Sequence, residues 1–207
     1  MARTPSSKRW LREHVTDPYV RQARNEGMRS RAAFKLKEIA ERDRLFGPGM
    51  TVIDLGAAPG GWSQVAARAV GASGQVYALD RLDFPPLPGV IRIQGDFEDE
   101  ATVLALEKRL GGASADLVLS DMAPNISGVA ALDQARTVAL AERALEFALK
   151  HLKPQGKFLV KVFHGAGYEA FLKTMRGRFH AVVVRKPDAS RSRSREVYLL
   201  GRGVKSA

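Results

Sequence analysis

The sequence predicts an α/β fold: a Rossmann-like sheet of seven mostly parallel strands with helices on both faces. Short apolar runs with β-branched residues alternate along the 207-residue chain with longer segments of helical character. This alternation is typical of parallel sheets, because a crossover between parallel strands needs a helix. The third observation is a glycine-rich turn, Gly56-Ala-Ala-Pro-Gly-Gly61, between the first apolar run and a helix. Such a turn brings backbone N–H groups against a polar or anionic ligand.

In the first half of the chain, an N-terminal helix precedes three strands and the helices between them. The first strand contains Val52, Ile53 and Leu55 and leads into Gly56, where the backbone can turn without a Cβ clash. An alanine-rich helix follows the glycine-rich turn. We predict helices over residues 30–42, 62–70 and 99–110, and strands over residues 51–55, 74–80 and 90–96.

In the second half, the alternation continues and then changes at the end. A long helix with apolar residues among alanines ends before Pro154-Gln-Gly156, which is a helix stop signal. Only a basic loop separates the last two strands, so they are expected to form an antiparallel hairpin at the edge of the sheet. We predict strands over residues 115–122, 157–163, 180–185 and 196–200, and helices over residues 132–152 and 167–176.

Length and composition favour one soluble domain over residues 1–207. No apolar run reaches the roughly 18 residues that span a bilayer, and the N-terminus lacks the apolar core of a signal peptide. We therefore expect no membrane partner. The absence of cysteine suits a reducing cytoplasm. The four histidines are scattered without ligand spacing, so no metal site is predicted.

Positive charge is concentrated at the two ends of the chain. The sequence has 33 Lys and Arg residues against 22 acidic ones, a formal net charge of +11. Residues 3–37 interleave basic side chains with Trp10, Tyr19 and Phe34, and residues 185–195 form a second basic cluster. Both clusters suit nucleic-acid phosphates, whereas the alternative is a solvated surface that keeps the protein soluble. Residues 1 to about 24 are expected to be flexible in part.

Two aspartates at predicted strand ends favour a nucleotide cofactor. Asp80 ends the second strand, where a carboxylate accepts hydrogen bonds from ribose hydroxyls. Asp96 ends the third strand and could bind the amino group of an adenine, whereas the alternative role is a helix N-cap. Ala58 stands where the dinucleotide fingerprint has its second glycine, which counts against a nicotinamide dehydrogenase.

Four more polar residues are expected at the same edge of the sheet. Asp121 ends the fourth strand, and Lys161 lies inside an otherwise apolar fifth strand. A buried lysine is unfavourable unless it is paired, so its presence invites a functional explanation. Glu196 can lie beside the fifth strand, and Lys35 could cap the same pocket. Except for Lys161, each has a structural alternative: Asp121 as a turn residue, Glu196 as an ion-pair partner and Lys35 as a solvated helix position.

Four segments together resemble the FtsJ/RrmJ family of S-adenosylmethionine-dependent RNA ribose 2′-O-methyltransferases, which have the class I methyltransferase fold. The similarity runs from about Arg29 to Gly201 and nearly covers the chain. Ala33 and Lys37 differ from the bulkier and acidic residues expected in that family. The four segments are Ser30-Arg-Ala-Ala-Phe-Lys-Leu-Lys-Glu-Ile39, Asp54-Leu-Gly-Ala-Ala-Pro-Gly-Gly-Trp-Ser63, Asp121-Met-Ala-Pro-Asn125 and Lys157-Phe-Leu-Val-Lys161.

The resemblance implies a role for each matching residue. The implied catalytic tetrad consists of Lys35, Asp121, Lys161 and Glu196. The implied cofactor is S-adenosylmethionine, with contacts at Gly60, Trp62, Asp80, Asp96 and Asp121, and with Asp54 and Gly56 in the same glycine-rich motif.

The reaction implied by the resemblance is methyl transfer from a sulfonium to a ribose 2′-hydroxyl, on a uridine of large-subunit (23S) ribosomal RNA. Because a hydroxyl is a weak nucleophile, Lys161 would either take its proton or stabilise the charge that develops on its oxygen. The implied partner is ribosomal RNA within the large subunit, and the enzyme is expected to be a cytoplasmic monomer. Alternatives are transfer RNA 2′-O-methylation, methylation of a small molecule, and a non-catalytic RNA-binding role in ribosome assembly.

Overall fold

The strands form a single seven-stranded sheet in the order β3-β2-β1-β4-β5-β7-β6. The computed structural model describes residues 17–125, 127–191 and 194–206. Strands β1 to β5 are parallel to one another, whereas β7 runs antiparallel to both β5 and β6. The strands are β1 (Thr51–Leu55), β2 (Gln75–Asp80), β3 (Val90–Gln94), β4 (Ala115–Ser120), β5 (Leu152–Phe163), β6 (Phe179–Arg185) and β7 (Glu196–Val204).

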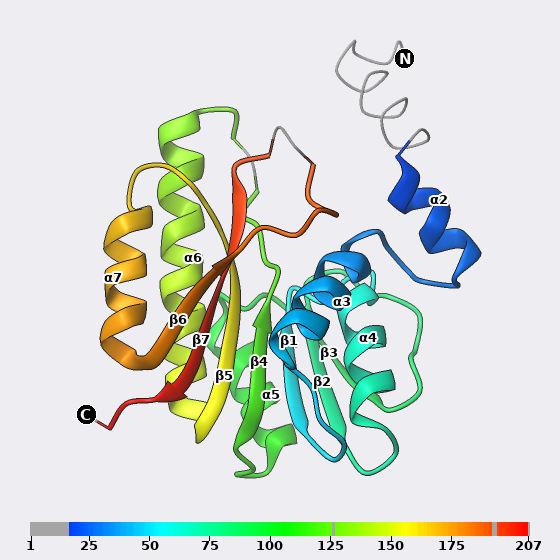
Figure 1. Cartoon of the computed structure of the whole chain (residues 1–207). Helices are drawn as coiled ribbons and strands as arrows, with labels where there is room; N and C mark the ends of the chain where they lie inside the picture. Colours follow the sequence, from blue (N-terminus) through cyan, green and yellow to red (C-terminus); the bar gives the residue numbers. More distant parts are fainter. Residues whose placement is uncertain (1–16, 126, 192–193, 207) are drawn as a thin grey trace.

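The helices cover both faces of the sheet, as predicted (Figure 1). Helices α3 and α4 lie on one face, and α5, α6 and α7 lie on the other. None of the helices in the described part of the chain is both long enough and apolar enough to cross a membrane. The helices are α2 (Pro18–Asn25), α3 (Ala32–Asp43), α4 (Gly61–Val70), α5 (Glu100–Leu110), α6 (Ala130–His151) and α7 (Tyr168–Arg178).

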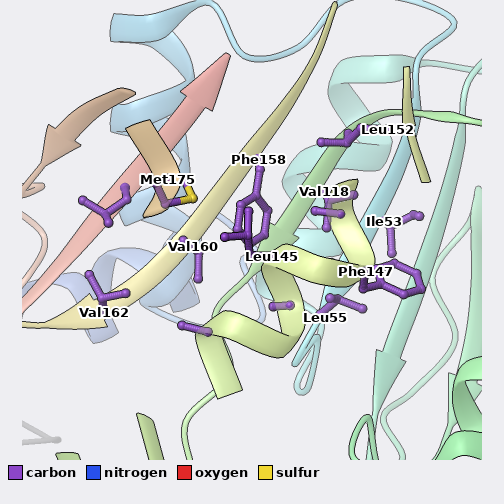
Figure 2. Close-up of a cluster of buried hydrophobic side chains, with 14 of the residues drawn as sticks. Ile53, Leu55, Val118, Leu145, Phe147, Leu152, Phe158, Val160, Val162 and Met175 are labelled. Atoms are coloured by element: carbon purple, nitrogen blue, oxygen red, sulfur yellow. The ribbon is translucent and has the colours of Figure 1, made fainter. Parts of the chain in front are cut away.

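Alternation along the strands divides the core into two layers. Successive side chains of a strand point to opposite faces of the sheet. Ile53, Phe158 and Val160 therefore pack against α6 and its neighbours (Figure 2). Val52 and Leu159 pack on the opposite face, in the cluster that includes α3 and α4. Because both faces are buried, the central strands are almost entirely apolar, as is typical of a parallel sheet.

The last two strands pair antiparallel as a hairpin at one edge of the sheet, as predicted, with β7 next to β5 and β6 outermost. One prediction about strands needs correction. Strand β5 begins at Leu152, directly after α6, and not at Lys157. Its pairing with β4 jumps from Leu152 to Lys157, so Pro154 falls where the ladder is irregular. A proline, which has no N–H to donate, is tolerated at such a place.

Where the structure describes it, the N-terminal segment forms a helix. Helix α2 occupies Pro18–Asn25, at the end of the segment expected to be flexible in part. The side chain of Asp17 accepts the N–H of Tyr19, and Pro18 stands in the first turn, where its missing N–H is not needed. Residues 1–16 lie outside the described part of the chain.

Candidate active site

A cavity of about 230 Å³ opens at the carboxyl ends of β1, β2 and β4. In open α/β sheets this edge is where ligands bind. Four residues predicted from the sequence to bind a cofactor line the cavity, namely Gly56, Asp80, Asp96 and Asp121. Apolar side chains of Leu82, Phe97, Met122 and Leu140 complete much of its wall.

The turn after β1 needs glycine at Gly56 because another loop lies against it. Gly56 has φ of +80°, and its N–H donates to the carbonyl of Leu79 at 2.9 Å. A Cβ atom added there would lie 2.7 Å from Cγ of Met122. The loops after β1 and β4 therefore approach each other closely, and only a residue without a side chain fits both the space and the backbone angle.

Asp80 fastens the glycine-rich turn to the end of β2. One of its carboxylate oxygens accepts the N–H of Ala58 at 2.9 Å, and the other accepts the N–H of Leu82 at 2.8 Å. Each oxygen can accept a further hydrogen bond, because a carboxylate has about four acceptor positions. Asp80 can thus hold the turn and still accept from a ligand hydroxyl.

Asp96 lies beyond the end of β3 and lines the same cavity. One carboxylate oxygen accepts the N–H of Glu98 at 2.9 Å, and the other lies 3.6 Å from a guanidinium nitrogen of Arg81. The N-cap of α5 is Asp99, whose side chain accepts from Ala101. The alternative that Asp96 serves as a helix N-cap is therefore wrong.

Three other predicted cofactor residues do not line the cavity. Gly60 and Trp62 stand at the start of α4, and the Trp62 indole N–H donates to the carbonyl of Ala32 at 2.8 Å. The Trp62 ring is buried against Tyr198, with centroids 5.6 Å apart. The tryptophan side chain thus packs α4 against α3 and the sheet, so any contact of Trp62 with a cofactor would be made by its backbone.

Asp54, the third of these residues, is a fully buried carboxyl. It accepts the hydroxyl of Ser63 at 2.6 Å, and its other oxygen has no hydrogen-bond partner. Burial raises the pKa of Asp54 to about 7, with smaller contributions from Asp121 and Asp80. This carboxyl therefore changes charge near neutral pH, which the sequence did not indicate.

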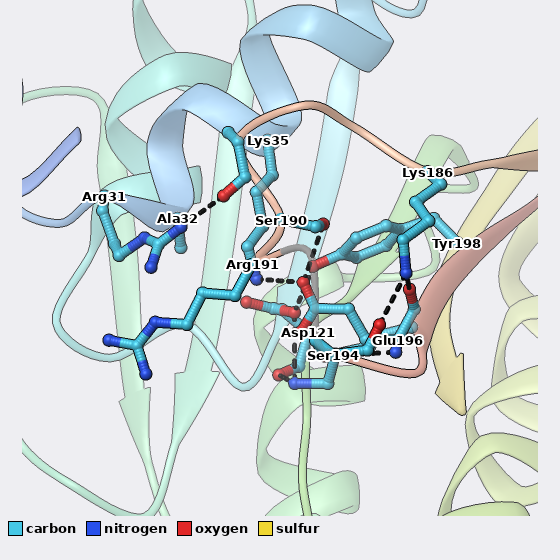
Figure 3. A network of polar contacts seen from close by, with 12 residues as sticks. Arg31, Ala32, Lys35, Asp121, Lys186, Ser190, Arg191, Ser194, Glu196 and Tyr198 are labelled. Atoms are coloured by element: carbon cyan, nitrogen blue, oxygen red, sulfur yellow. Dashed lines mark hydrogen bonds and ion pairs between the residues drawn. The ribbon is translucent and has the colours of Figure 1, made fainter. Parts of the chain in front are cut away.

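A cluster of charged side chains adjoins the cavity, and Asp121 belongs to both (Figure 3). The Lys161 ammonium lies 3.2 Å from the Asp121 carboxylate and donates to the Asp121 carbonyl at 2.7 Å. The Lys161 side chain is only 10% exposed. Asp121, the residue directly after β4, thus provides the partner that a buried lysine needs.

The other two predicted residues, Lys35 and Glu196, form an ion pair within the same network (Figure 3). The Glu196 carboxylate also accepts the hydroxyl of Ser190 at 2.9 Å. Burial alone would raise the pKa of Glu196, but the charge and hydrogen bond of Lys35, with help from Ser190 and Lys161, lower it overall. Glu196 is therefore held as a carboxylate although little of it is exposed.

The register of β5 and β7 explains why these groups meet. Lys161 is paired with Tyr198, and Phe163 with Glu196, so Lys161, Tyr198 and Glu196 share the face that α3 covers. Tyr198 was not predicted. Its hydroxyl donates to Asp121 at 3.1 Å, and burial together with Asp121 and Glu196 raises its pKa. Its position two residues after Glu196 was the available signal, because residues i and i+2 share a face.

The cavity and the cluster define the class of protein: a Rossmann-like α/β protein with a cavity at the carboxyl ends of its strands, beside two lysines that are each paired with a carboxylate. The chain belongs to the FtsJ-like methyltransferase family, whose model matches residues 28–204. The family resemblance drawn from the sequence motifs is thereby confirmed.

Relatives of known name agree with this assignment. The chain is 60% identical over 201 residues to the ribosomal RNA large subunit methyltransferase E of Azoarcus sp. (strain BH72), covering 97% of this chain and 98% of the relative. It is 58% identical over 203 residues to the protein of the same name from Chromobacterium violaceum, covering 98% and 99%. The fold matches the crystal structure of a protein assigned as a ribosomal RNA methyltransferase from Plasmodium falciparum, with a TM-score of 0.76, 26% identity, and 85% and 98% of the chains covered.

Proposed function

We propose that this protein transfers a methyl group from S-adenosylmethionine to the ribose 2′-hydroxyl of a uridine in large-subunit ribosomal RNA. The observation that carries the proposal is the double role of Asp121, which lines the cofactor cavity and binds Lys161. A methyl donor in the cavity would thus lie next to the amine that handles the acceptor. Relatives at 58–60% identity are named large-subunit ribosomal RNA methyltransferases, which supports the choice of substrate.

The residues around the cavity fit S-adenosylmethionine. Asp80 has acceptor capacity left for ribose hydroxyls, and Asp96 has a carboxylate oxygen that faces only Arg81 at 3.6 Å. Leu82 and Phe97 offer apolar surface of the kind that an adenine ring packs against. When bound, S-adenosylmethionine supplies an electrophilic methyl group on a positively charged sulfur. No group of three or more metal-ligating side chains is found in the described part of the chain.

Lys161 is the residue that we propose acts on the ribose hydroxyl. An ammonium has three N–H donors; Lys161 donates one to the Asp121 carbonyl and forms an ion pair with the Asp121 carboxylate. A remaining N–H can be directed at the 2′-oxygen, where it would orient the hydroxyl and stabilise the charge that develops as the proton leaves. Asp121 would fix the position of the amine, and the Lys35–Glu196 pair would stand on the acceptor side of it.

A second cleft, of about 470 Å³, extends from this cluster and is lined by Arg31, Lys35, Arg191, Ser194 and Glu196. Three of these five side chains are cationic. Arginine forks bind phosphate groups well, and RNA carries one such group for each nucleotide. We propose that the acceptor RNA enters here, with its backbone on the arginines and its ribose toward Lys161. Because ribosomal RNA is the proposed substrate, the protein would act in the cytoplasm.

The test is methyl transfer from labelled S-adenosylmethionine to large-subunit rRNA, transfer RNA and small hydroxyl acceptors offered separately. We expect label only in the large-subunit RNA. In cells that lack the protein, we expect the large-subunit RNA to lose one uridine 2′-O-methyl group. Label in transfer RNA would instead support the second acceptor class. RNA binding without any transfer would identify a non-catalytic assembly factor and contradict the proposal.

A further inference from the structure

Asp17 neutralises two arginines that line the proposed RNA cleft. Its carboxylate forms an ion pair with Arg31 and lies 3.8 Å from Nε of Arg191. The Asp17 side chain is only 9% exposed, so the carboxylate is enclosed by its partners. Arg31 and Arg191 come from the two basic clusters of the sequence, which Asp17 thus joins.

The two oxygens of Asp17 have different partners. Oδ1 accepts the N–H of Tyr19 at 3.0 Å and caps α2, whereas Oδ2 faces Arg31 and Arg191. Capping uses only one oxygen and needs no charge, since asparagine caps helices as well as aspartate does. The contact with the arginines is therefore an additional feature that the helix itself does not require.

A carboxylate between two guanidinium groups occupies the position that a phosphate group would take. Both anions are bound by arginine through the same planar set of N–H donors. Arg31 is held at this position from other sides as well, because it donates to the Ala189 carbonyl and lies over the Tyr19 ring at 5.8 Å. The arginine would keep its place if the carboxylate left, which is what an exchangeable anion site requires.

We propose that Asp17 occupies a subsite for an RNA backbone phosphate, and that RNA must displace this carboxylate in order to bind productively. The inference rests on the proposed function, because it assumes that RNA enters the cleft beside Lys35 and Glu196. Displacement needs only a local change at Asp17. The rest of α2 remains attached through Ala23, which is buried, and through Tyr19, whose ring lies 5.8 Å from that of Phe34.

This arrangement would make the enzyme selective. An RNA that offers scattered phosphates gains little from replacing one anion by another at the arginine pair. An RNA whose ribose also reaches Lys161 has further contacts that offset the loss of the Asp17 ion pair. Asp17 would thus weaken the binding of all RNA at the arginine pair. Only RNA whose ribose also reaches Lys161 has contacts that offset this loss.

The experiment measures binding of transcribed large-subunit rRNA to the full-length wild-type protein and to Asp17→Asn over a range of salt concentrations. Asparagine keeps the cap of α2 and removes the charge. We expect the variant to bind at least about threefold more tightly at low salt. Its plot of log K against log salt concentration should be steeper, because salt also screens the Asp17 ion pair that RNA must break in the wild type.

The matched control is Glu41→Gln, which changes the net charge by the same amount on an exposed position of α3, about 15 Å along the helix from Arg31. Its affinity and salt slope should stay at wild-type values. Equal or weaker binding by Asp17→Asn would overturn the inference, since the carboxylate would then merely orient the arginines. Methyl transfer by the wild type is followed in the same samples, and its absence would contradict the proposed function separately.

Discussion

At the scale of single residues, Asp121 is the position on which both parts of the site depend. Its carboxylate accepts the Tyr198 hydroxyl and forms an ion pair with Lys161, and its carbonyl accepts an N–H of Lys161. Because Lys161 is nearly buried, these contacts supply the partners that an enclosed ammonium needs. Removing one partner of a buried pair leaves the other charge uncompensated, which is strongly destabilising.

Replacing Lys161 by alanine is expected to lower single-turnover methylation by at least about 10²-fold, because positioned proton-handling groups contribute on that order. S-adenosylmethionine binding, measured by calorimetry, should persist, since Lys161 does not line the cofactor cavity. Lys173→Ala, an exposed change on α7, serves as control. Methylation by the Lys161 variant at the wild-type rate would remove this residue from its proposed role.

The raised pKa of Asp54 leads us to expect that this residue makes a pH-dependent contribution to the free energy of unfolding. Its pKa is about 7 in the folded protein against an ordinary value of 3.8, so the folded state holds a proton that the unfolded state loses between these values. This contribution is therefore full below about pH 3.8, declines as pH rises toward 7, and is constant above. The difference amounts to up to about 4 kcal/mol.

Asp54→Asn, which imitates the protonated acid, should accordingly stabilise the protein more at pH 8 than at pH 5. Urea unfolding of the wild type and the variant at both pH values measures this difference directly. The same free-energy change at both pH values would show that Asp54 is ionised throughout, contrary to the raised pKa.

At the scale of secondary-structure elements, contact between the starts of α3 and α4 positions α3, and with it Lys35, over the sheet. A Cβ added at Gly61 would lie 2.2 Å from the Ser30 hydroxyl oxygen, and the Trp62 indole N–H donates to Ala32. Lys35 lies one turn further along α3 and reaches Glu196 from there. A change that separates the two helices should therefore disturb this ion pair.

Gly61→Ala is expected to destabilise the protein by about 1 kcal/mol, the low end for overpacking, because the Ser30 hydroxyl must rotate away from the added Cβ. Gly177→Ala provides the contrast. This glycine lies in α7 with nothing within 4 Å of an added Cβ, so alanine should stabilise by about 0.5–1 kcal/mol. Denaturant unfolding measures both. A neutral Gly61 variant would mean that rotation of the Ser30 side chain accommodates the methyl group at no cost.

At the scale of the whole molecule, the two basic clusters of the sequence meet at one cleft. Arg31 comes from the N-terminal basic cluster and Arg191 from the C-terminal one, yet both line the space beside Lys35 and Glu196. Part of the positive charge behind the formal net charge of +11 therefore lies next to the site. A cationic cleft attracts a polyanion over distances that depend on ionic strength.

RNA binding should therefore weaken steeply with salt. If about three phosphates contact the cleft, the affinity for large-subunit rRNA is expected to fall by at least about tenfold between 50 mM and 200 mM salt. Filter binding over this range tests the prediction, with S-adenosylmethionine binding as the comparison. An RNA affinity that does not change with salt would rule out the basic cleft as the binding surface.

Much of the fold could be predicted because its signals are local. Apolar runs, helical periodicity and the glycine-rich turn each depend on residues within a few positions of one another. The exception is a junction. Strand β5 follows α6 without a loop despite Pro154. There, the pairing of Leu152 with β4 outweighed the local sequence preference.

The sequence by itself determined the order of the elements, the family, and the four charged residues that the structure brings together. Only the tertiary structure decided that Tyr198 reaches Asp121, that Trp62 faces the core, and that Asp17 holds Arg31. The physical reason is distance along the chain. These contacts join segments far apart in sequence, and their geometry depends on strand order and register, which no local pattern specifies.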